Sequence, residues 1–375
     1  MSRPILYHSS PPESLQAAYL EYDNVDFILN VGPGRSLLKD TVRILGDVRV
    51  TIDGTTRTVG GQYWDRKCGA HSFIQSCQTS FGGGSSQGGQ ENIDNYARWV
   101  AMQSIATENE DDMLNASKQV ELKAINDLCV EALALGELTV PAAGADPVYQ
   151  DSDFAIKPYC MLNRMSGDDL PFEKTGDITL TINLSRNITA LMGNQQDSST
   201  AYQLTNLRVI FQSIPTVGNP RTKSTVFQSV HNVKSSVQSS LASVRVQVPA
   251  ICSAVSISFM KQSDENVPVL SGVECQKLPG IRDLSFLFNS ANEFITYQIQ
   301  DINEMLKRYI ESFGDTGMNQ VYLDTFRGNN GFGLGLNFRE LINLSNQQFT
   351  MQVTSDITNN DPVSAFFYFH TVIQV

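Results

Sequence analysis

Charged residues are scarce in this chain of 375 residues. They make up 18% of it, against about 25% in an average soluble protein. Polar uncharged residues take their place, as in the stretches SSVQSSLASVRVQV and NNDPVSAFFYFHTVIQV. Because charged residues are depleted at the centres of protein interfaces, this composition is typical of a chain whose faces are covered by other chains. It is equally typical of a β-rich protein with polar strands and loops, and the two interpretations are compatible.

Basic clusters and long apolar runs are also missing. The net charge of −12 argues against a sequence-specific nucleic-acid-binding protein, which normally carries basic patches. No apolar run approaches the roughly 18 residues of a membrane-spanning helix. The N-terminal stretch MSRPILYHSSPPESLQ lacks the basic and then apolar pattern of a signal peptide. We therefore expect a protein that is not secreted by a signal peptide.

Cysteine and histidine occur without the spacing that redox and metal sites need. The six cysteines form no C-x-x-C pair, so we expect free, buried thiols in a reducing compartment. The four histidines show no H-x-H or H-E-x-x-H pattern. His71 follows Cys68 in DRKCGAHSF, so the two could form a Cys/His pair. The sequence shows no third group that would orient the histidine for nucleophilic catalysis. We therefore predict no catalytic residue, no metal site, no cofactor and no enzymatic activity.

A glycine-rich loop, residues 82–89 in TSFGGGSSQGGQENIDNYARW, has the composition of a phosphate-binding loop and runs into a predicted helix. A Walker A loop requires a lysine after the last glycine, whereas Gln90 and Glu91 stand there. Glu91 and Asp94, placed in the first turn of that helix, would complement its dipole and repel a phosphate. We predict a flexible connection that binds no nucleotide.

A second glycine pattern, RGNNGFGLGLNF, places Gly331, Gly333 and Gly335 at every second position. On a strand this spacing removes the side chains from one face. We predict the close approach of another part of the backbone, or a bend of a barrel, over that face.

Most of the chain alternates between apolar and polar residues, and short runs end at Gly, Pro, Asn or Asp, which is typical of β-sandwiches and jelly rolls. Two helical blocks interrupt the strands. The first is predicted near 91–135, as one helix from Ile93 and a second over about 110–135. The second is predicted near 290–313, where Ser290 and Glu293 form a capping box and Gly314 follows as the C′ residue.

The order of these elements is the same in both halves of the chain: strands, a helical insertion, then strands. We predict a mainly all-β fold of two tandem jelly-roll β-sandwiches with helical insertions. Residues 1–24 are predicted to be an extended arm, 25–214 the first jelly roll, 215–225 a linker and 226–375 the second jelly roll. Strands from both halves pairing in one sheet would contradict that linker.

In this order of elements the chain resembles the double jelly-roll major capsid proteins, the lineage of adenovirus hexon, virophages, Polinton-like viruses and tailless phages. The stretches FAIKPYCMLN, LPFEKTGDITLTINLSRN and YQLTNLRVIFQSI carry the resemblance in the first half. In the second half it is carried by GFGLGLNFRELINLSNQQFTMQV and AFFYFHTVIQV.

The resemblance implies a structural protein of the virion, assembled in the host cytoplasm or nucleus. It implies a homotrimer with six sandwiches, hence a pseudo-hexameric capsomer that tiles an icosahedral shell. Its partners would be neighbouring capsomers together with penton and minor capsid proteins. The arm would contact a neighbour, the genome or an internal membrane.

Three alternatives remain open from the sequence. A penton, minor capsid or spike protein more often has a single jelly roll. A tandem jelly-roll carbohydrate-binding protein usually exposes aromatic platforms, but only Trp64 and Trp99 are tryptophans here. A cupin-type enzyme needs clustered histidine ligands, which the spacing does not provide.

Overall fold

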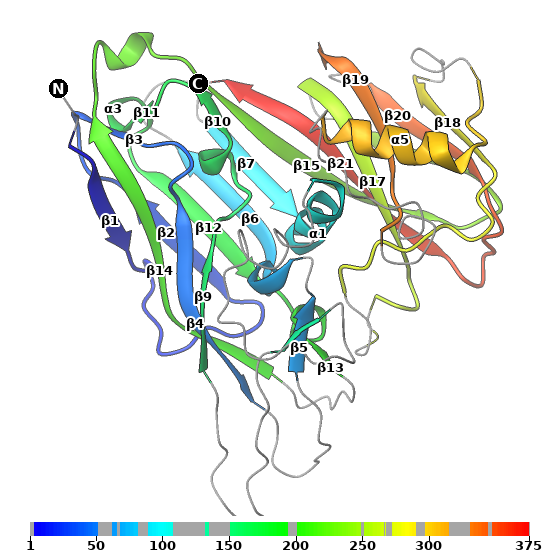
Figure 1. Ribbon diagram of the computed structural model, residues 1–375, viewed down its shortest axis with the longest axis horizontal. Helices are drawn as coiled ribbons and strands as arrows, with labels where there is room; N and C mark the ends of the chain where they lie inside the picture. The colour runs from blue at the N-terminus through cyan, green and yellow to red at the C-terminus, as the bar shows by residue number, and fades with distance from the viewer. Residues whose placement is uncertain are drawn as a thin grey trace, which may run out of the picture. The chain divides into compact units, whose positions relative to one another are not determined.

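The computed structural model describes residues 4–51, 62–65, 68–81, 89–107, 132–134, 151–193, 201–248, 251–265, 267, 272–289, 297–314, 331–343 and 347–374. Within these residues the chain forms mainly antiparallel strands and few helices (Figure 1). Its contacts divide it into two compact units. Unit 1 comprises residues 1–97, 111–229 and 373–375, and unit 2 comprises residues 98–110 and 230–372.

Unit 1 contains two main sheets and one small sheet. The first sheet has the order β11 (Leu170–Pro171), β3 (Arg35–Leu37), β14 (Ala201–Pro215), β4 (Arg43–Thr51) and β9 (Asp151–Ile156), and β1 (Leu6–Ser10) also pairs with β14. The second has the order β2 (Asn24–Leu29), β12 (Ile178–Leu184), β6 (Ile74–Phe81) and β7 (Gly89–Asp94). The small sheet has the order β13 (Met192–Gly193), β5 (Gln62–Asp65) and β8 (Ala132–Ala134).

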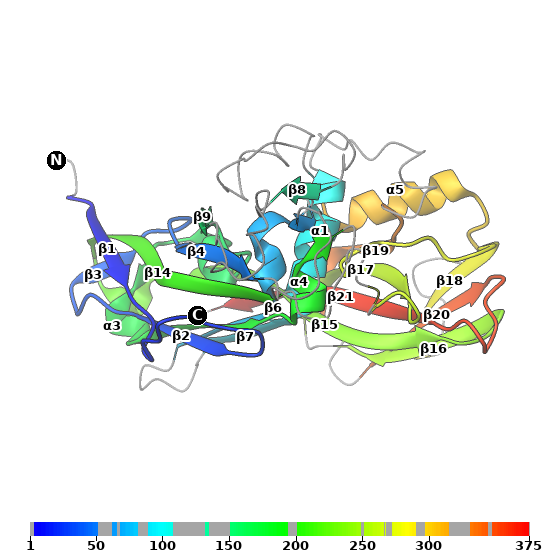
Figure 2. The same ribbon diagram turned by 90° about the horizontal axis from the view of Figure 1, so that it is seen from below.

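The alternation in the sequence explains how these sheets make a core. Every second residue of β12 is apolar and buried: Ile178, Leu180, Ile182 and Leu184. Figure 2 shows β14 and β4 in one layer and β2, β6 and β7 in the other. Phe73, at the end of the 3₁₀ helix η1 (Gly69–Phe73), packs against Tyr202 of β14 with ring centroids 4.8 Å apart. The buried apolar faces of a two-layer sandwich therefore follow directly from period-two patterning.

Unit 2 has the same two-layer construction. One sheet runs β15 (Thr225–Val237), β21 (Val363–Gln374), β17 (Ile251–Lys261) and β19 (Leu334–Asn343), and the short strand β10 (Met165–Gly167) of the first half pairs with the start of β15 at its edge. The other sheet runs β16 (Leu241–Gln247), β20 (Gln348–Thr354) and β18 (Asp283–Phe288). Phe349 of β20 joins the layers, because its ring lies 5.2 Å from that of Phe288 and 5.8 Å from that of Phe369 in β21. The fold of the described residues is thus the mainly β, double jelly-roll arrangement that was predicted.

Helices are short and sit between strands. The longer ones are α1 (Tyr96–Thr107) and α5 (Ile302–Ser312), and single turns are η2 (Met161–Asn163), α3 (Phe172–Thr175), α4 (Asn187–Ala190) and η3 (Pro220–Thr222). None of the helices in the described ranges is long and apolar enough to cross a membrane.

The first helical block begins later than predicted. Residues 91–94, placed in the helical block from the sequence, belong to strand β7, which pairs with β6 and has buried residues at alternate positions. Helix α1 starts only at Tyr96, after Asn95 adopts a left-handed φ of 50° that separates the two elements. Most of the second helix predicted over 110–135 lies outside the described residues, and 132–134 form strand β8.

The second helical block is also shorter than predicted. Helix α5 begins at Ile302, where the Asp301 side chain caps it by accepting a hydrogen bond of 2.8 Å from the Asn303 N–H. Ile299, assigned to the helical stripe from the sequence, instead forms a β-bridge with Leu284. Gly314 has the positive φ of 95° expected of a C′ glycine. The proposed capping box at Ser290 and Glu293 lies outside the described residues.

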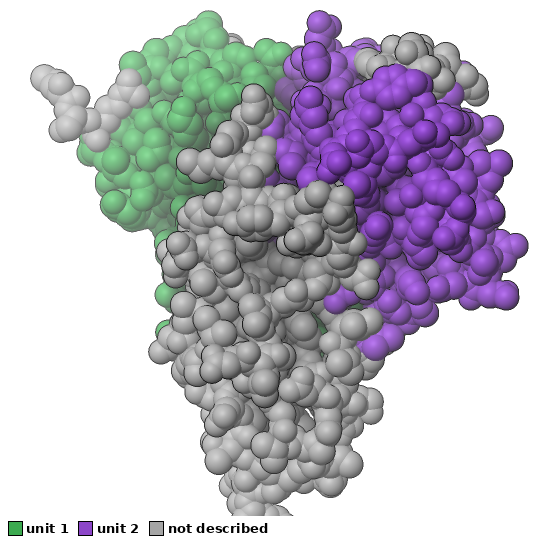
Figure 3. All heavy atoms as spheres, turned by 45° about the vertical axis from the view of Figure 1, so that its right-hand side comes forward, with its two compact units in different colours: residues 1–97, 111–229, 373–375 green, residues 98–110, 230–372 purple. Residues whose placement is uncertain are grey.

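The predicted arm and linker are more closely integrated than expected. Residues 6–10 of the arm are strand β1 and pair with residues 209–213 of β14. The contact division falls after Ser229, inside β15, rather than within 215–225 (Figure 3). The cause is strand pairing, because β10, from the predicted first jelly roll, pairs with the first three residues of β15 and holds them in unit 1. Strands from both halves therefore pair in one sheet, and the prediction that 215–225 cleanly separates two sandwiches is wrong. That each jelly roll is a separately folding domain stays a prediction.

Candidate functional sites: a buried carboxylate and an open groove

The histidines lie apart from one another, and His71 and His370 each contact a nearby hydroxyl group. In unit 1, the Nδ1 atom of His71 lies 2.9 Å from the Tyr96 hydroxyl, and its ring also packs beside Tyr159. In unit 2, the Nε2 atom of His370 lies 2.8 Å from the Ser256 hydroxyl. Across the ranges that the structure describes, no three His, Cys, Asp or Glu side chains gather closely enough to hold a metal ion.

The glycine-rich loop joins two neighbouring strands of one hairpin. Residues 82–88 lie outside the described residues, but Phe81 at the end of β6 pairs with Gly89 at the start of β7. Because a strand and not a helix follows the loop, the helix N-terminus that would attract a phosphate is absent at this point. Flexibility of the loop stays a prediction.

A buried carboxylate, which the sequence analysis missed, lies in unit 1. Glu91 of β7 is 2% exposed. One carboxylate oxygen accepts a hydrogen bond of 2.7 Å from the Met161 N–H of η2, and the other lies 2.6 Å from the Ser229 hydroxyl of β15. A single side chain therefore connects β7, η2 and β15.

Burial controls the charge state of this carboxylate. Desolvation raises the pKa of Glu91 to about 7, although the hydrogen bonds from Ser229 and Met161 and the nearby charge of Arg164 act in the opposite direction. A carboxyl with a pKa near neutrality can serve as a general acid or base in an open site. Glu91 is enclosed by protein, and its two oxygens are occupied by hydrogen bonds, so the arrangement fits a structural connection.

The thiols around Glu91 are inert for the same reason. Desolvation, with the nearby Glu91 carboxylate as a further cause, raises the pKa of Cys160 to about 12. Desolvation likewise raises the pKa of Cys77. The five cysteines that the structure describes are all buried and form no disulfide, which confirms the prediction of buried thiols for Cys68, Cys77, Cys160, Cys252 and Cys275.

The predicted close approach over the glycine stripe is confirmed in unit 2. Helix α5 lies across β19, with Tyr309 and Ser312 over the positions of Gly333 and Gly335. A Cβ atom on Gly335 would lie 3.1 Å from the Cα atom of Tyr309, so the helix backbone itself comes close to the strand. The opposite face of the strand carries buried Phe332, Leu334 and Leu336.

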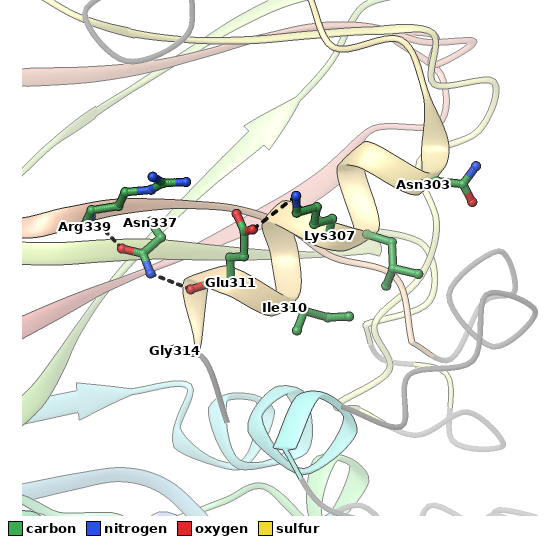
Figure 4. Close-up of a pocket in the computed structure, with 8 residues that line it drawn as sticks. Asn303, Lys307, Ile310, Glu311, Gly314, Asn337 and Arg339 are labelled. Carbon is green, nitrogen blue, oxygen red and sulfur yellow. Dashed lines mark hydrogen bonds and ion pairs between the residues drawn. The ribbon is translucent and has the colours of Figure 1, made fainter. Parts of the chain in front are cut away.

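A groove of about 530 Å³ runs along the outer flank of α5 in unit 2 (Figure 4). It is lined by residues of α5, its C′ glycine and two residues of β19: Asn303, Leu306, Lys307, Ile310, Glu311, Gly314, Asn337 and Arg339. Lys307 and Glu311 form an ion pair of 3.8 Å, and Asn337 donates a hydrogen bond of 2.7 Å to the Glu311 carbonyl. The groove thus combines an aliphatic strip with two cations and one anion.

Among the comparisons with known proteins, only the comparison with solved structures finds matches. No protein-family model matches the sequence, and no curated protein matches it. Solved structures do match along the whole chain. The major capsid protein of Faustovirus has a TM-score of 0.60 at 7% identity, covering 100% of this chain and 90% of that one.

Two further capsid structures are similar. The PBCV-1 virus capsid has a TM-score of 0.59 at 10% identity, covering 100% of this chain and 95% of that chain. The Sputnik virophage structure has a TM-score of 0.55 at 13% identity, covering 99% of this chain and 85% of that one. The chain therefore has the fold of double jelly-roll viral major capsid proteins, as the sequence resemblance predicted.

Proposed function

We propose that this chain is a viral major capsid protein, a structural component of the virion and not an enzyme. The observation that carries the proposal is the double jelly-roll fold, shared over the full chain with the capsid proteins of Faustovirus and PBCV-1. In this proposal three copies form a trimer of six sandwiches, and the pseudo-hexameric trimers tile an icosahedral shell. Penton and minor capsid proteins are its further partners.

The distribution of exposed apolar side chains supports self-association. Twelve large hydrophobic side chains are exposed in the described residues, and six of them fall within 5–22: Ile5, Leu6, Tyr7, Leu15, Leu20 and Tyr22. Several large apolar side chains exposed within one short segment are consistent with a contact with another chain. We refer to these six residues as the N-terminal apolar strip, and we assign it to contacts between copies or with the inner side of the shell.

Strand β1 supports the same conclusion. It pairs on one side with β14, and no other described strand pairs with it. All of its residues are exposed or half-buried. An exposed apolar edge strand is a liability for a protein that stays monomeric, whereas coverage by a neighbouring copy removes the exposed edge.

The solution mass of the purified protein tests the proposal. Light scattering coupled to size exclusion is expected to give a mass near three times 41.4 kDa. Electron micrographs of the same fraction are expected to show particles with hexagonal outlines. A mass of one chain at every concentration up to the solubility limit would contradict the capsomer assignment, and a glycan-binding screen would then test the carbohydrate-binding alternative.

A further inference from the structure

The α5–β19 groove is a preformed surface of unit 2. Between Asn337 and Ile342 the pairing of β19 with β17 is interrupted, because residues 338–341 stand opposite the single residue Ser253. Arg339 lies in this bulge with a positive φ of 63°, and its N–H donates a hydrogen bond of 2.7 Å to the Asn337 side chain. A positive φ costs free energy in the folded state for a residue other than glycine. β-Bulges often redirect side chains at functional surfaces.

The groove has the chemistry to bind an acidic and apolar segment. Leu306 and Ile310 stand four residues apart on one face of α5, and both are half-buried, so they form an aliphatic strip. Within the described residues Arg339 makes no ion pair, while Lys307 is already paired with Glu311. Arg339 is therefore the cation left to receive a carboxylate.

The length of the groove limits the size of its occupant. Its lining residues on α5 and the C′ position extend from Asn303 to Gly314, which corresponds to about 16 Å at about 1.5 Å per residue. A segment of roughly five residues spans that distance, at about 3.3 Å per residue when extended. A short loop of another chain fits this length.

Segment 13–17 of unit 1, with the sequence ESLQA, has the matching chemistry. All five residues are exposed, and the Leu15 side chain is 76% exposed. Glu13 supplies a carboxylate two residues before Leu15. An aliphatic side chain so open to water gains free energy when an apolar surface covers it.

This segment is also held in one conformation. The hydroxyl of Tyr19, a residue 2% exposed, donates a hydrogen bond of 2.8 Å to the Ser14 carbonyl and accepts one of 3.2 Å from the Gln16 N–H. Leu15 lies between these two anchored residues. A loop that is ordered before binding loses less conformational entropy when it binds.

We propose that segment 13–17 of one copy occupies the α5–β19 groove of a second copy of this chain. Leu15 packs on Leu306 and Ile310, and Glu13 pairs with Arg339. The contact joins two different surfaces, one in unit 1 and one in unit 2. In the proposed trimer each copy therefore gives its segment to one neighbour and receives the segment of the other. This inference rests on the self-association proposed above and assigns residues to it.

Charge reversal in the full-length protein tests the contact. Arg339→Glu and Leu15→Asp are each expected to weaken association by tenfold or more on dilution, as measured by light scattering, with unchanged thermal unfolding of the dissociated chain. The double variant Glu13→Arg with Arg339→Glu is expected to restore association. Arg245→Glu, at an exposed position of β16, is the matched control and is expected to change nothing.

Chemical cross-linking gives an independent measurement. The double variant Leu15→Cys with Ile310→Cys, treated with a short bismaleimide, is expected to give bands of two and three linked chains on a denaturing gel. Leu15→Cys with Ser243→Cys is the control and is expected to remain at one chain. If the protein associates but Arg339→Glu has no effect and the cross-link is absent, this contact is wrong and the proposed function stands. If the protein is a monomer under all conditions, the proposed function fails and this contact fails with it.

Discussion

Gly335 of β19 lies directly beneath Ser312 of α5, so closely that a Cβ atom at position 335 would stand 2.7 Å from the Cβ atom of Ser312. The glycine therefore sets the distance at which the helix packs on the sheet, and with it the width of the groove along the flank of α5.

Gly335→Ala is expected to lower the free energy of unfolding by about 1–3 kcal/mol, because the added methyl group must push α5 away from the sheet. Urea denaturation followed by circular dichroism measures the loss. Ser243→Ala, on the exposed face of β16, is the control and should stay within about 0.5 kcal/mol of the parent. Equal stability of the Gly335→Ala variant would mean that the helix is not held against β19.

Glu91→Gln is expected to change how stability depends on pH. The pKa of Glu91 rises from 4.5 in the unfolded chain to about 7 in the folded one, so folding favours the protonated form. This contribution is fully present below about pH 4.5 and is lost as the pH rises through about 7. At about 1.4 kcal/mol for each unit of pKa, the loss is on the order of 3 kcal/mol.

The measurement compares the free energy of unfolding of parent and variant from pH 4.5 to 8.5. Glutamine keeps an oxygen for the Met161 N–H and can donate to the Ser229 hydroxyl, so the contacts of the protonated carboxyl are retained. The variant is expected to gain on the parent as the pH rises and to reach a constant difference above about pH 8. Parallel curves for the two proteins would show that Glu91 does not titrate in this range.

Arg98→Met is expected to destabilise unit 2 by about 2 kcal/mol or more. The guanidinium of Arg98 donates a hydrogen bond of 2.7 Å to the Gly272 carbonyl, bonds the Glu274 carbonyl as well, and lies 4.2 Å from the centre of the Phe366 ring. Methionine fills a similar volume but leaves both carbonyls without this donor. Thermal unfolding measures the effect, with the exposed Arg245→Met as control. An unchanged midpoint would mean that water satisfies both carbonyls.

The buried cysteines are expected to resist alkylation in the folded protein. Cys160 and Cys252 both have a pKa raised to about 12 by burial, and the thiolate is the reactive form. With iodoacetamide at pH 8, labelling of both residues should be on the order of a thousandfold slower than in urea. Mass spectrometry of the peptides measures each site separately. Labelling of the native protein at a rate close to that in urea would contradict the burial of these side chains.

The strands were largely predictable because their buried residues alternate with polar ones. Strand β12 shows this plainly, with Ile178, Leu180, Ile182 and Leu184 facing the core. Strand β7 was misread because one of its inward positions is a glutamate. The partners of Glu91, Ser229 and the Met161 N–H, lie far away in the sequence, so no local sequence pattern predicts that Glu91 is buried.

Only one of the features that form the groove could be predicted from the sequence. The stripe of Gly331, Gly333 and Gly335 predicted that another part of the chain would lie close to one strand face. Which element would do so depends on the packing of Tyr309 and Ser312, which is a tertiary relationship. The bulge at Arg339 could not be predicted either, since arginine rarely adopts a positive φ and nothing local favours it there.

Helix α1 has a consequence for the order in which the chain can fold during synthesis. Trp99 is fully buried in unit 2, where its ring packs against Phe313, Tyr368 and His370. The last two of these partners leave the ribosome roughly 270 residues later, a delay of roughly 13–54 s at about 5–20 residues per second. During that time Trp99 lacks the partners that bury it in the folded protein. The core of unit 2 is therefore completed only when these late residues pack against a helix synthesised in the first third of the chain. Removing the first half of the gene would therefore leave a hole in the core of the second unit.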